Sequence, residues 1–73
     1  MRWETSKRST HRHLLFPKGT KSGGHIAVVW LSGKSWDANI LKAGIIVRHL
    51  SGMESLPVAK ARAEKSAKEA NGL

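Results

Sequence analysis

The chain has 73 residues, no cysteine and a formal net charge of +8 at pH 7. These values exclude disulfides and thiolate metal sites, and no apolar run approaches the roughly 18 residues of a membrane-spanning helix. With 40% hydrophobic residues, the composition is that of one small folded domain covering residues 1–73. The charged N-terminus does not resemble a signal peptide. We therefore expect a cytosolic protein with an acidic partner, either nucleic acid or an acidic protein surface.

The positive charge is concentrated at the N-terminal end, where residues 1–21 hold six Lys and Arg residues against a single Glu. Residues 1–10 show no period and are expected to form a basic arm. Its tryptophan either packs back onto the core, which we favour, or contacts the partner. Basic residues interleaved with planar side chains suit a phosphate backbone or an acidic groove. The predicted partner-binding residues are Arg2, Trp3, Lys7, Arg8, His11, Arg12 and His13.

Two strands are predicted in the next part of the chain. Residues 11–16 form the first, which Pro17 ends because proline has no amide hydrogen for a strand ladder. Residues 18–24 form a basic, glycine-rich loop, most simply a hairpin connection. Residues 24–31 are the longest apolar and β-branched run, and both alternating faces are apolar. We expect a buried central strand that has either cover on both faces or a neighbouring strand on each edge.

The remaining residues predict more strand and then a helix. Residues 36–50 are either one bent strand or two, and Trp30 and Trp36 are expected to pack in the core rather than stack on bases. A break at 51–54 precedes a helix over 58–70, with Ser55 as the N-cap and Asn71-Gly72 as the C-terminal stop. A stripe of small residues predicts a weakly docked helix: Leu56, Ala59, Ala63, Ala67 and Ala70. The fold class is therefore α+β, a small antiparallel sheet of three or four strands followed by one C-terminal helix.

The sequence contains no motif that indicates catalysis. Its five acidic residues have no interpretable spacing, no glycine-flanked serine nucleophile occurs, and no phosphate-binding loop ends in Gly-Lys-Ser/Thr. His11 and His13 share a strand face, but a metal site needs a third ligand and none is evident. We expect a monomeric protein that is not an enzyme and holds no metal or cofactor.

Part of the chain resembles known DNA-binding domains. The segments Trp36-Asp37-Ala38-Asn39-Ile40 and His49-Leu50-Ser51-Gly52, with Gly44 between them and the alanine-spaced helix from Val58, are similar to the plant ethylene-response-factor and phage integrase-arm domains. Those domains pack a three-stranded antiparallel sheet on one helix and place the sheet in the DNA major groove. The resemblance covers about half of the chain and implies a DNA-binding domain.

The whole chain, from Met1-Arg2-Trp3-Glu4-Thr5 to the Lys- and Ala-rich helix, resembles small regulators of host RNA polymerase encoded by Xanthomonas bacteriophages. This resemblance implies binding to the N-terminal region of the largest polymerase subunit, near the RNA exit channel, in the host bacterial cytoplasm. It implies inhibition of initiation through sigma-factor displacement and suppression of termination. The basic N-terminal segment would then contact an acidic polymerase patch or emerging RNA. Transcription regulation is the leading expectation, DNA binding is the alternative, and a small subunit of a nucleoprotein assembly is a third class.

Overall fold

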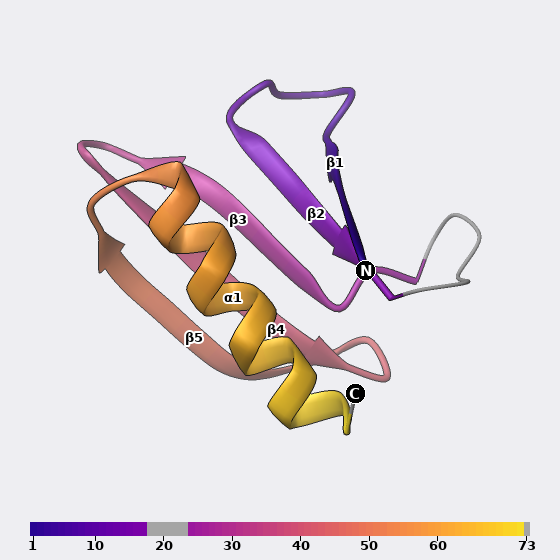
Figure 1. Cartoon of the computed structure of the whole chain (residues 1–73). Helices are drawn as coiled ribbons and strands as arrows, with labels where there is room; N and C mark the ends of the chain where they lie inside the picture. Colours follow the sequence, from indigo (N-terminus) through magenta and orange to yellow (C-terminus); the bar gives the residue numbers. More distant parts are fainter. Residues whose placement is uncertain (18–23, 73) are drawn as a thin grey trace.

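The chain folds into one antiparallel sheet followed by a C-terminal helix (Figure 1). The computed structural model describes residues 1–17 and 24–72. The strands lie in chain order, each pairing with the next: β1 (Arg2–Thr5), β2 (Arg12–Phe16), β3 (Ala27–Ser32), β4 (Ser35–Lys42) and β5 (Ile45–Met53). The helix α1 spans Leu56–Asn71. The α+β class predicted from the sequence is confirmed, and the described residues form five strands in the sheet rather than three or four.

Strand β1 replaces the N-terminal arm that the sequence predicts. Trp3 pairs with Leu15 of β2, and its side chain packs against the core. The preference for packing over contact at this tryptophan agrees with the structure. Strand β1 has only four residues in a charged segment, so its sequence shows no alternation from which a strand could be predicted. The strand forms through its pairing with β2 and its contact with α1.

Residues 36–50 form parts of two strands, which answers the alternative left open by the sequence. The turn between them uses Ala43 at φ 52° and Gly44 at φ 79°, a pair of left-handed residues that matches the twist of a two-residue hairpin. Strand β5 then continues to Met53 through Gly52 at φ 68°. The break predicted at residues 51–54 is therefore wrong up to Met53, since a glycine with positive φ bends the strand without ending it.

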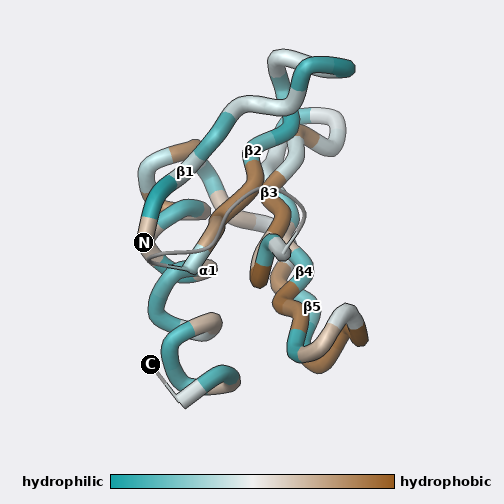
Figure 2. The backbone as a smooth tube through the Cα atoms, turned by 90° about the vertical axis from the view of Figure 1, so that its right-hand side faces the viewer, coloured by the Kyte–Doolittle hydropathy of each residue, from teal (hydrophilic) through white to brown (hydrophobic). Residues whose placement is uncertain are grey.

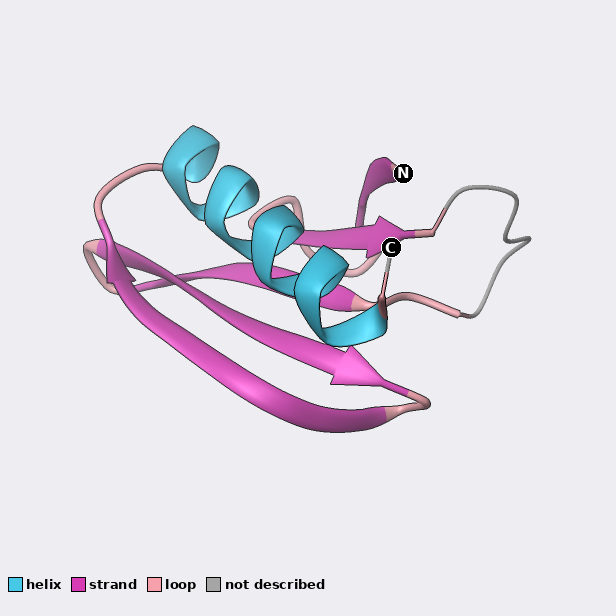
Figure 3. Cartoon of the chain, turned by 60° about the horizontal axis from the view of Figure 1, so that its bottom comes forward, coloured by secondary structure: helices cyan, strands magenta, loops and turns pink. Residues whose placement is uncertain are grey.

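The helix agrees closely with the sequence. The Ser55 hydroxyl accepts a hydrogen bond from the Val58 amide at 3.4 Å, as an N-cap residue does. Gly72 at φ 71° provides the C-cap, and its amide donates to the Lys68 carbonyl. The helix lies across one face of the sheet and contacts β3, β4 and β5 (Figures 1 and 3).

The core lies between α1 and the side of the sheet that faces it, which we call the helix face. The fully buried side chains there include Leu15, Val29 and Ile40 from three strands. Three alanines of α1 are fully buried against them: Ala59, Ala63 and Ala67. Small side chains allow the helix backbone to approach the sheet closely, although each buries little apolar area. Figure 2 shows the hydrophobic colour mainly on the strands, whereas most of α1 is hydrophilic.

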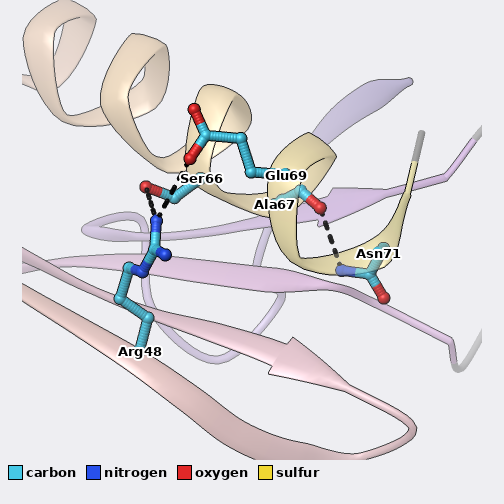
Figure 4. Close-up of polar contacts among 5 residues, drawn as sticks. All are labelled: Arg48, Ser66, Ala67, Glu69 and Asn71. Atoms are coloured by element: carbon cyan, nitrogen blue, oxygen red, sulfur yellow. Dashed lines mark hydrogen bonds and ion pairs between the residues drawn. The ribbon is translucent and has the colours of Figure 1, made fainter.

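Polar contacts join the C-terminal half of α1 to the sheet, and Figure 4 shows those of Arg48. Arg48 Nη1 donates to Ser66 Oγ and to Glu69 Oε2, each at 3.4 Å. Asn71 Nδ2 donates to the carbonyl of Leu41 at 3.0 Å. These contacts also place Arg48 on the helix face of β5. Within the described residues, no helix has the length and apolar character needed to cross a bilayer.

The opposite side of the sheet, which we call the open face, has no helix or strand over it among the described residues (Figure 3). By strand alternation and register it carries Arg2, Glu4, Arg12, Leu14, Phe16, Val28, Trp30, Asp37, Asn39 and His49. Val28 and Phe16 are buried on this face, at 5% and 6% exposure, outside the main core cluster. Of the two alternatives for the central strand, β3 therefore has a neighbouring strand on each edge and helical cover on one face.

Candidate nucleic-acid interface

All seven partner-binding residues predicted from the sequence lie in or beside the β1–β2 hairpin, but the structure divides them between two sides of the sheet. Trp3 and His13 lie on the helix face. Trp3 Nε1 donates to Glu64 Oε2 at 3.2 Å, and Lys60 Nζ lies 5.5 Å from the indole centroid. Through these contacts the Trp3 side chain packs against α1, on the side of the sheet away from the open face.

His13 is buried, with 8% of its surface exposed. Its ring lies 6.0 Å from that of Trp36, and its Nδ1 is 3.5 Å from the Thr5 hydroxyl. Burial lowers the pKa of His13 below its ordinary value of 6.5, and the charges of Lys60 and His11 lower it further. The structure therefore favours a neutral imidazole in the interior at this position.

The exposed bases of the hairpin gather at one end of the sheet. Because neighbouring strands are antiparallel, the β1–β2 loop and the β3–β4 turn lie at the same end. We call this region the basic end; its residues are Lys7, Arg8, His11, Arg12 and Lys34, all exposed. Neither the loop nor the turn contains an acidic residue. Lys18 and Lys21, which the sequence placed in another basic loop, lie outside the described residues.

The β1–β2 loop has its own hydrogen bonds. The Arg8 amide donates to Ser6 Oγ at 3.2 Å, and the His11 amide donates to Ser9 Oγ at 3.3 Å. The Ser6 amide donates to the Arg12 carbonyl at 2.8 Å and closes the loop. Short polar side chains of this kind stabilise turns through their own backbone. The loop therefore presents its cations from a defined backbone.

Two rows of side chains cross the open face beside the basic end. In the first row, Arg12 lies opposite Trp30, which lies opposite Asp37. The second row ends in Asn39 and His49, whose Oδ1 and Nδ1 atoms are 2.7 Å apart. The His49 ring lies 6.0 Å from the Trp30 ring. Arg12 on β2 is thereby placed on the same face as polar and aromatic groups of β3, β4 and β5.

Three residues of this surface were not predicted as site residues. Trp30 was expected in the core, but alternation places it on the open face, where it is half-buried. Trp36, by contrast, packs against the core cluster as expected. Asn39 and His49 meet only through the β4–β5 register. In the sequence, the only indication of this pairing was the possible turn at Ala43-Gly44, which joins β4 to β5.

Arg2 completes the edge of the open face. Its guanidinium carbon lies 5.0 Å from the Phe16 ring centroid, and its Nε donates to Glu4 Oε2 at 3.2 Å. The Asp37 carboxylate accepts a hydrogen bond from the Gly52 amide at 3.3 Å. The two acidic side chains of this face thus each have one carboxylate oxygen in an exposed hydrogen bond within the chain.

The described residues contain no group of three or more His, Cys, Asp or Glu side chains placed to hold a metal ion. His11 is exposed while His13 is buried, so the two differ in access to solvent. The surface that the fold builds from these residues is one of bases, hydrogen-bond donors and half-buried aromatics. Comparisons of the chain with models of protein families, with curated proteins and with solved structures found no match.

Proposed function

We propose that this chain binds double-stranded DNA, with the open face against base edges and the basic end against phosphates. The observation that carries the proposal is that α1 covers only one face of the sheet and leaves the polar rows uncovered beside the basic end. Phosphate contacts position a protein on a duplex, whereas base-edge contacts supply specificity. In this proposal the basic end supplies the phosphate contacts, and the open face supplies the base-edge contacts.

The dimensions of the sheet suit a major groove. That groove is about 12 Å wide and admits a two-stranded β-ribbon. Strands β4 and β5 are the longest in the sheet, with 8 and 9 residues, and they carry Asn39 and His49 on the open face. We infer that the β4–β5 ribbon enters the groove and that the basic end reaches the flanking backbone.

A duplex fits this face better than a single strand does. Proteins that bind single strands stack successive bases on exposed aromatic rings. Phe16 is only 6% exposed and lies beneath the Arg2 guanidinium. The Trp30 ring is half-buried beside His49. Neither aromatic side chain offers a free stacking platform, whereas the polar edges beside them are accessible.

The proposal is tested by the affinity for a short duplex, measured by fluorescence anisotropy at two salt concentrations. We expect binding that weakens steeply as salt rises, because phosphate contacts release counterions. Arg12→Ala should weaken binding about fivefold or more. The matched control is Arg62→Ala, which removes an exposed arginine from α1. Equal effects of the two substitutions, or tighter binding to the corresponding single strand, would contradict the assignment.

A second candidate function follows the overall likeness to phage regulators. In this alternative the chain binds bacterial RNA polymerase in the host cytoplasm, displaces the sigma factor and suppresses termination. The observation that favours it is the exposed pair Lys7 and Arg8 in a loop without acidic residues. Such a loop suits an acidic protein surface, because opposite charge accelerates association.

A further inference from the structure

We propose that the open face reads the methyl group of thymine through an apolar pair near the tip of the β4–β5 ribbon. The pair consists of Leu41 on β4 and Ile46 on β5, which lie opposite each other. This inference rests on the proposed binding of duplex DNA and adds a base-specific contact to it. Ile46 is the side chain that meets the methyl group.

The register of β4 and β5 decides which face carries Ile46. Arg48 lies on the helix face, where it bonds to α1, and in a regular strand Ile46 would share that face. The register shifts at this point, so that Val47 is an extra residue of β5 and Ile46 pairs with Leu41. Residues directly opposite each other on antiparallel strands share a face. Leu41 is two residues from Asn39, so the apolar pair lies on the open face.

The side chains at this tip are the most exposed large apolar groups in the described part of the chain. Ile46 is 56% exposed, and its neighbours Ile45 and Val47 are 68% and 50% exposed. Leu41 is half-buried beside them in the sheet. A contiguous group of exposed apolar side chains marks an interaction site, whereas single ones need no explanation.

The distribution of charge favours nucleic acid as the occupant of this patch. Residues 38–53, which contain the whole tip, include Lys42 and Arg48 and no acidic residue. The ribbon therefore carries no carboxylate near the tip that would repel phosphates. A second copy of the chain is the less suitable occupant, because each copy carries a formal charge of +8 and like charges repel.

The spacing of the pairs along the ribbon is compatible with the spacing of bases. Leu41 and Asn39 are two residues apart on β4, which corresponds to about 6.8 Å along a strand. Successive bases of one DNA strand are about 3.4 Å apart along the helix axis. In a ribbon that follows the groove, the apolar pair and the Asn39–His49 pair therefore stand over base pairs about two steps apart.

Thymine offers the chemical group that this apolar pair can contact. In the major groove it presents a C5-methyl group beside its O4 acceptor, and apolar side chains contact that methyl group. Removing apolar surface from water is favourable in proportion to the area removed. Uracil carries a hydrogen at the same position, so the apolar pair gains affinity from thymine that it does not gain from uracil.

The experiment compares two duplexes of the same mixed A·T sequence, one built with thymine and the other with uracil. The two differ in the methyl groups alone, and they present the same donors and acceptors. By fluorescence anisotropy at low salt, we expect the wild-type chain to bind the thymine duplex about threefold or more tighter, as burial of one methyl group predicts. Ile46→Ala should remove most of this difference.

The matched control is Ile45→Ala. Ile45 is of the same type and is also exposed, but it pairs with Lys42 on the helix face. Its substitution should leave the ratio of thymine to uracil affinity unchanged. A second pair of duplexes, of G·C sequence with cytosine or 5-methylcytosine, carries the same methyl group on other base pairs. The methylated form should bind more tightly by a similar factor.

Each contrary result has a distinct meaning. Equal binding of the thymine and uracil duplexes, or a gain from methyl groups on only one of the two pairs of duplexes, would overturn the methyl contact and leave DNA binding in place. An equal loss of the ratio in Ile45→Ala and Ile46→Ala would overturn the assignment to the open face. Failure to bind any duplex at low salt would overturn the proposed function together with this inference.

Self-association is measured on the same samples by analytical ultracentrifugation. A wild-type dimer that Ile46→Ala dissociates, with an unchanged ratio of thymine to uracil affinity, would assign the patch to a second copy and overturn the inference. A monomer in both cases agrees with it. Circular dichroism checks the fold of each variant, and both substitutions are at exposed positions.

Discussion

At the scale of single residues, His13 is the polar side chain that the fold buries among the described residues. It sits on the helix face between Thr5 and Trp36. Burial lowers the pKa of His13, and nearby Lys60 and His11 act in the same direction. The histidine is thus tied to stability, although its sequence neighbours look like a binding segment.

We expect the free energy of unfolding to fall as the pH is lowered through 6.5, the ordinary pKa of histidine. Above that pH His13 is neutral in both states and the contribution is fully present. Below it the unfolded chain takes up a proton at His13, while the folded chain resists until the pH reaches its lowered pKa. Urea unfolding at about pH 5.5 and about pH 7.5 spans the range in which histidines titrate. His13→Gln should flatten the dependence, whereas His11→Gln, on an exposed residue of the same hairpin, should change it much less.

At the scale of elements, α1 depends on the small size of the residues it buries. Ala63 is fully buried against the sheet, whereas Ala61 on the same helix is exposed. We expect Ala63→Leu to lower the free energy of unfolding by about 1–3 kcal/mol, because added methylene groups force the helix away from β4. Ala61→Leu should be nearly neutral in the same urea titration. Equal destabilisation by both would mean that α1 does not pack through its alanine stripe.

The same scale shows what the sequence could and could not predict. The helix repeats its pattern of small residues over several turns and has clear caps at Ser55 and Gly72, so its position could be predicted to within a few residues. Strand β1 could not, because four residues carry too little pattern. Both faces of β3 are apolar in sequence, so the sequence does not show which face α1 covers. Trp30 was therefore expected in the core, whereas it lies half-buried on the open face.

The candidate site was harder to predict than the fold. Exposed bases such as Lys7 and Arg8 follow from charge alone, and the structure leaves them exposed. The Asn39–His49 pair depends on the cross-strand register of β4 and β5. That register shifts between Trp36 and Ala38 and again between Ile40 and Leu41. Residue spacing along one strand does not reveal such shifts.

At the scale of the whole molecule, the question is whether net charge or its placement governs binding to polymerase. Reversing Lys7 and Arg8 to Glu should weaken binding to purified bacterial RNA polymerase and slow association, with the fold intact. Reversing Lys65 and Lys68 changes the formal charge equally on α1, where Lys68 already faces Glu64 at 3.7 Å. Titration of both variants at two salt concentrations separates the two possibilities. Equal losses would show that only net charge matters, and a larger loss from α1 would move the contact to the helix.

The neighbour-to-neighbour order of the sheet also bears on how the chain reaches its native state. Hairpins close short loops, so their entropic cost is small and they form early relative to distant pairings. The contact between Trp3 and Glu64 is different, because it joins residues 61 positions apart. It cannot form until the residues of α1 have been made, because they follow all five of the described strands. The Trp3 side chain therefore reaches its contact with the helix later than the β1–β2 hairpin that carries it can pair.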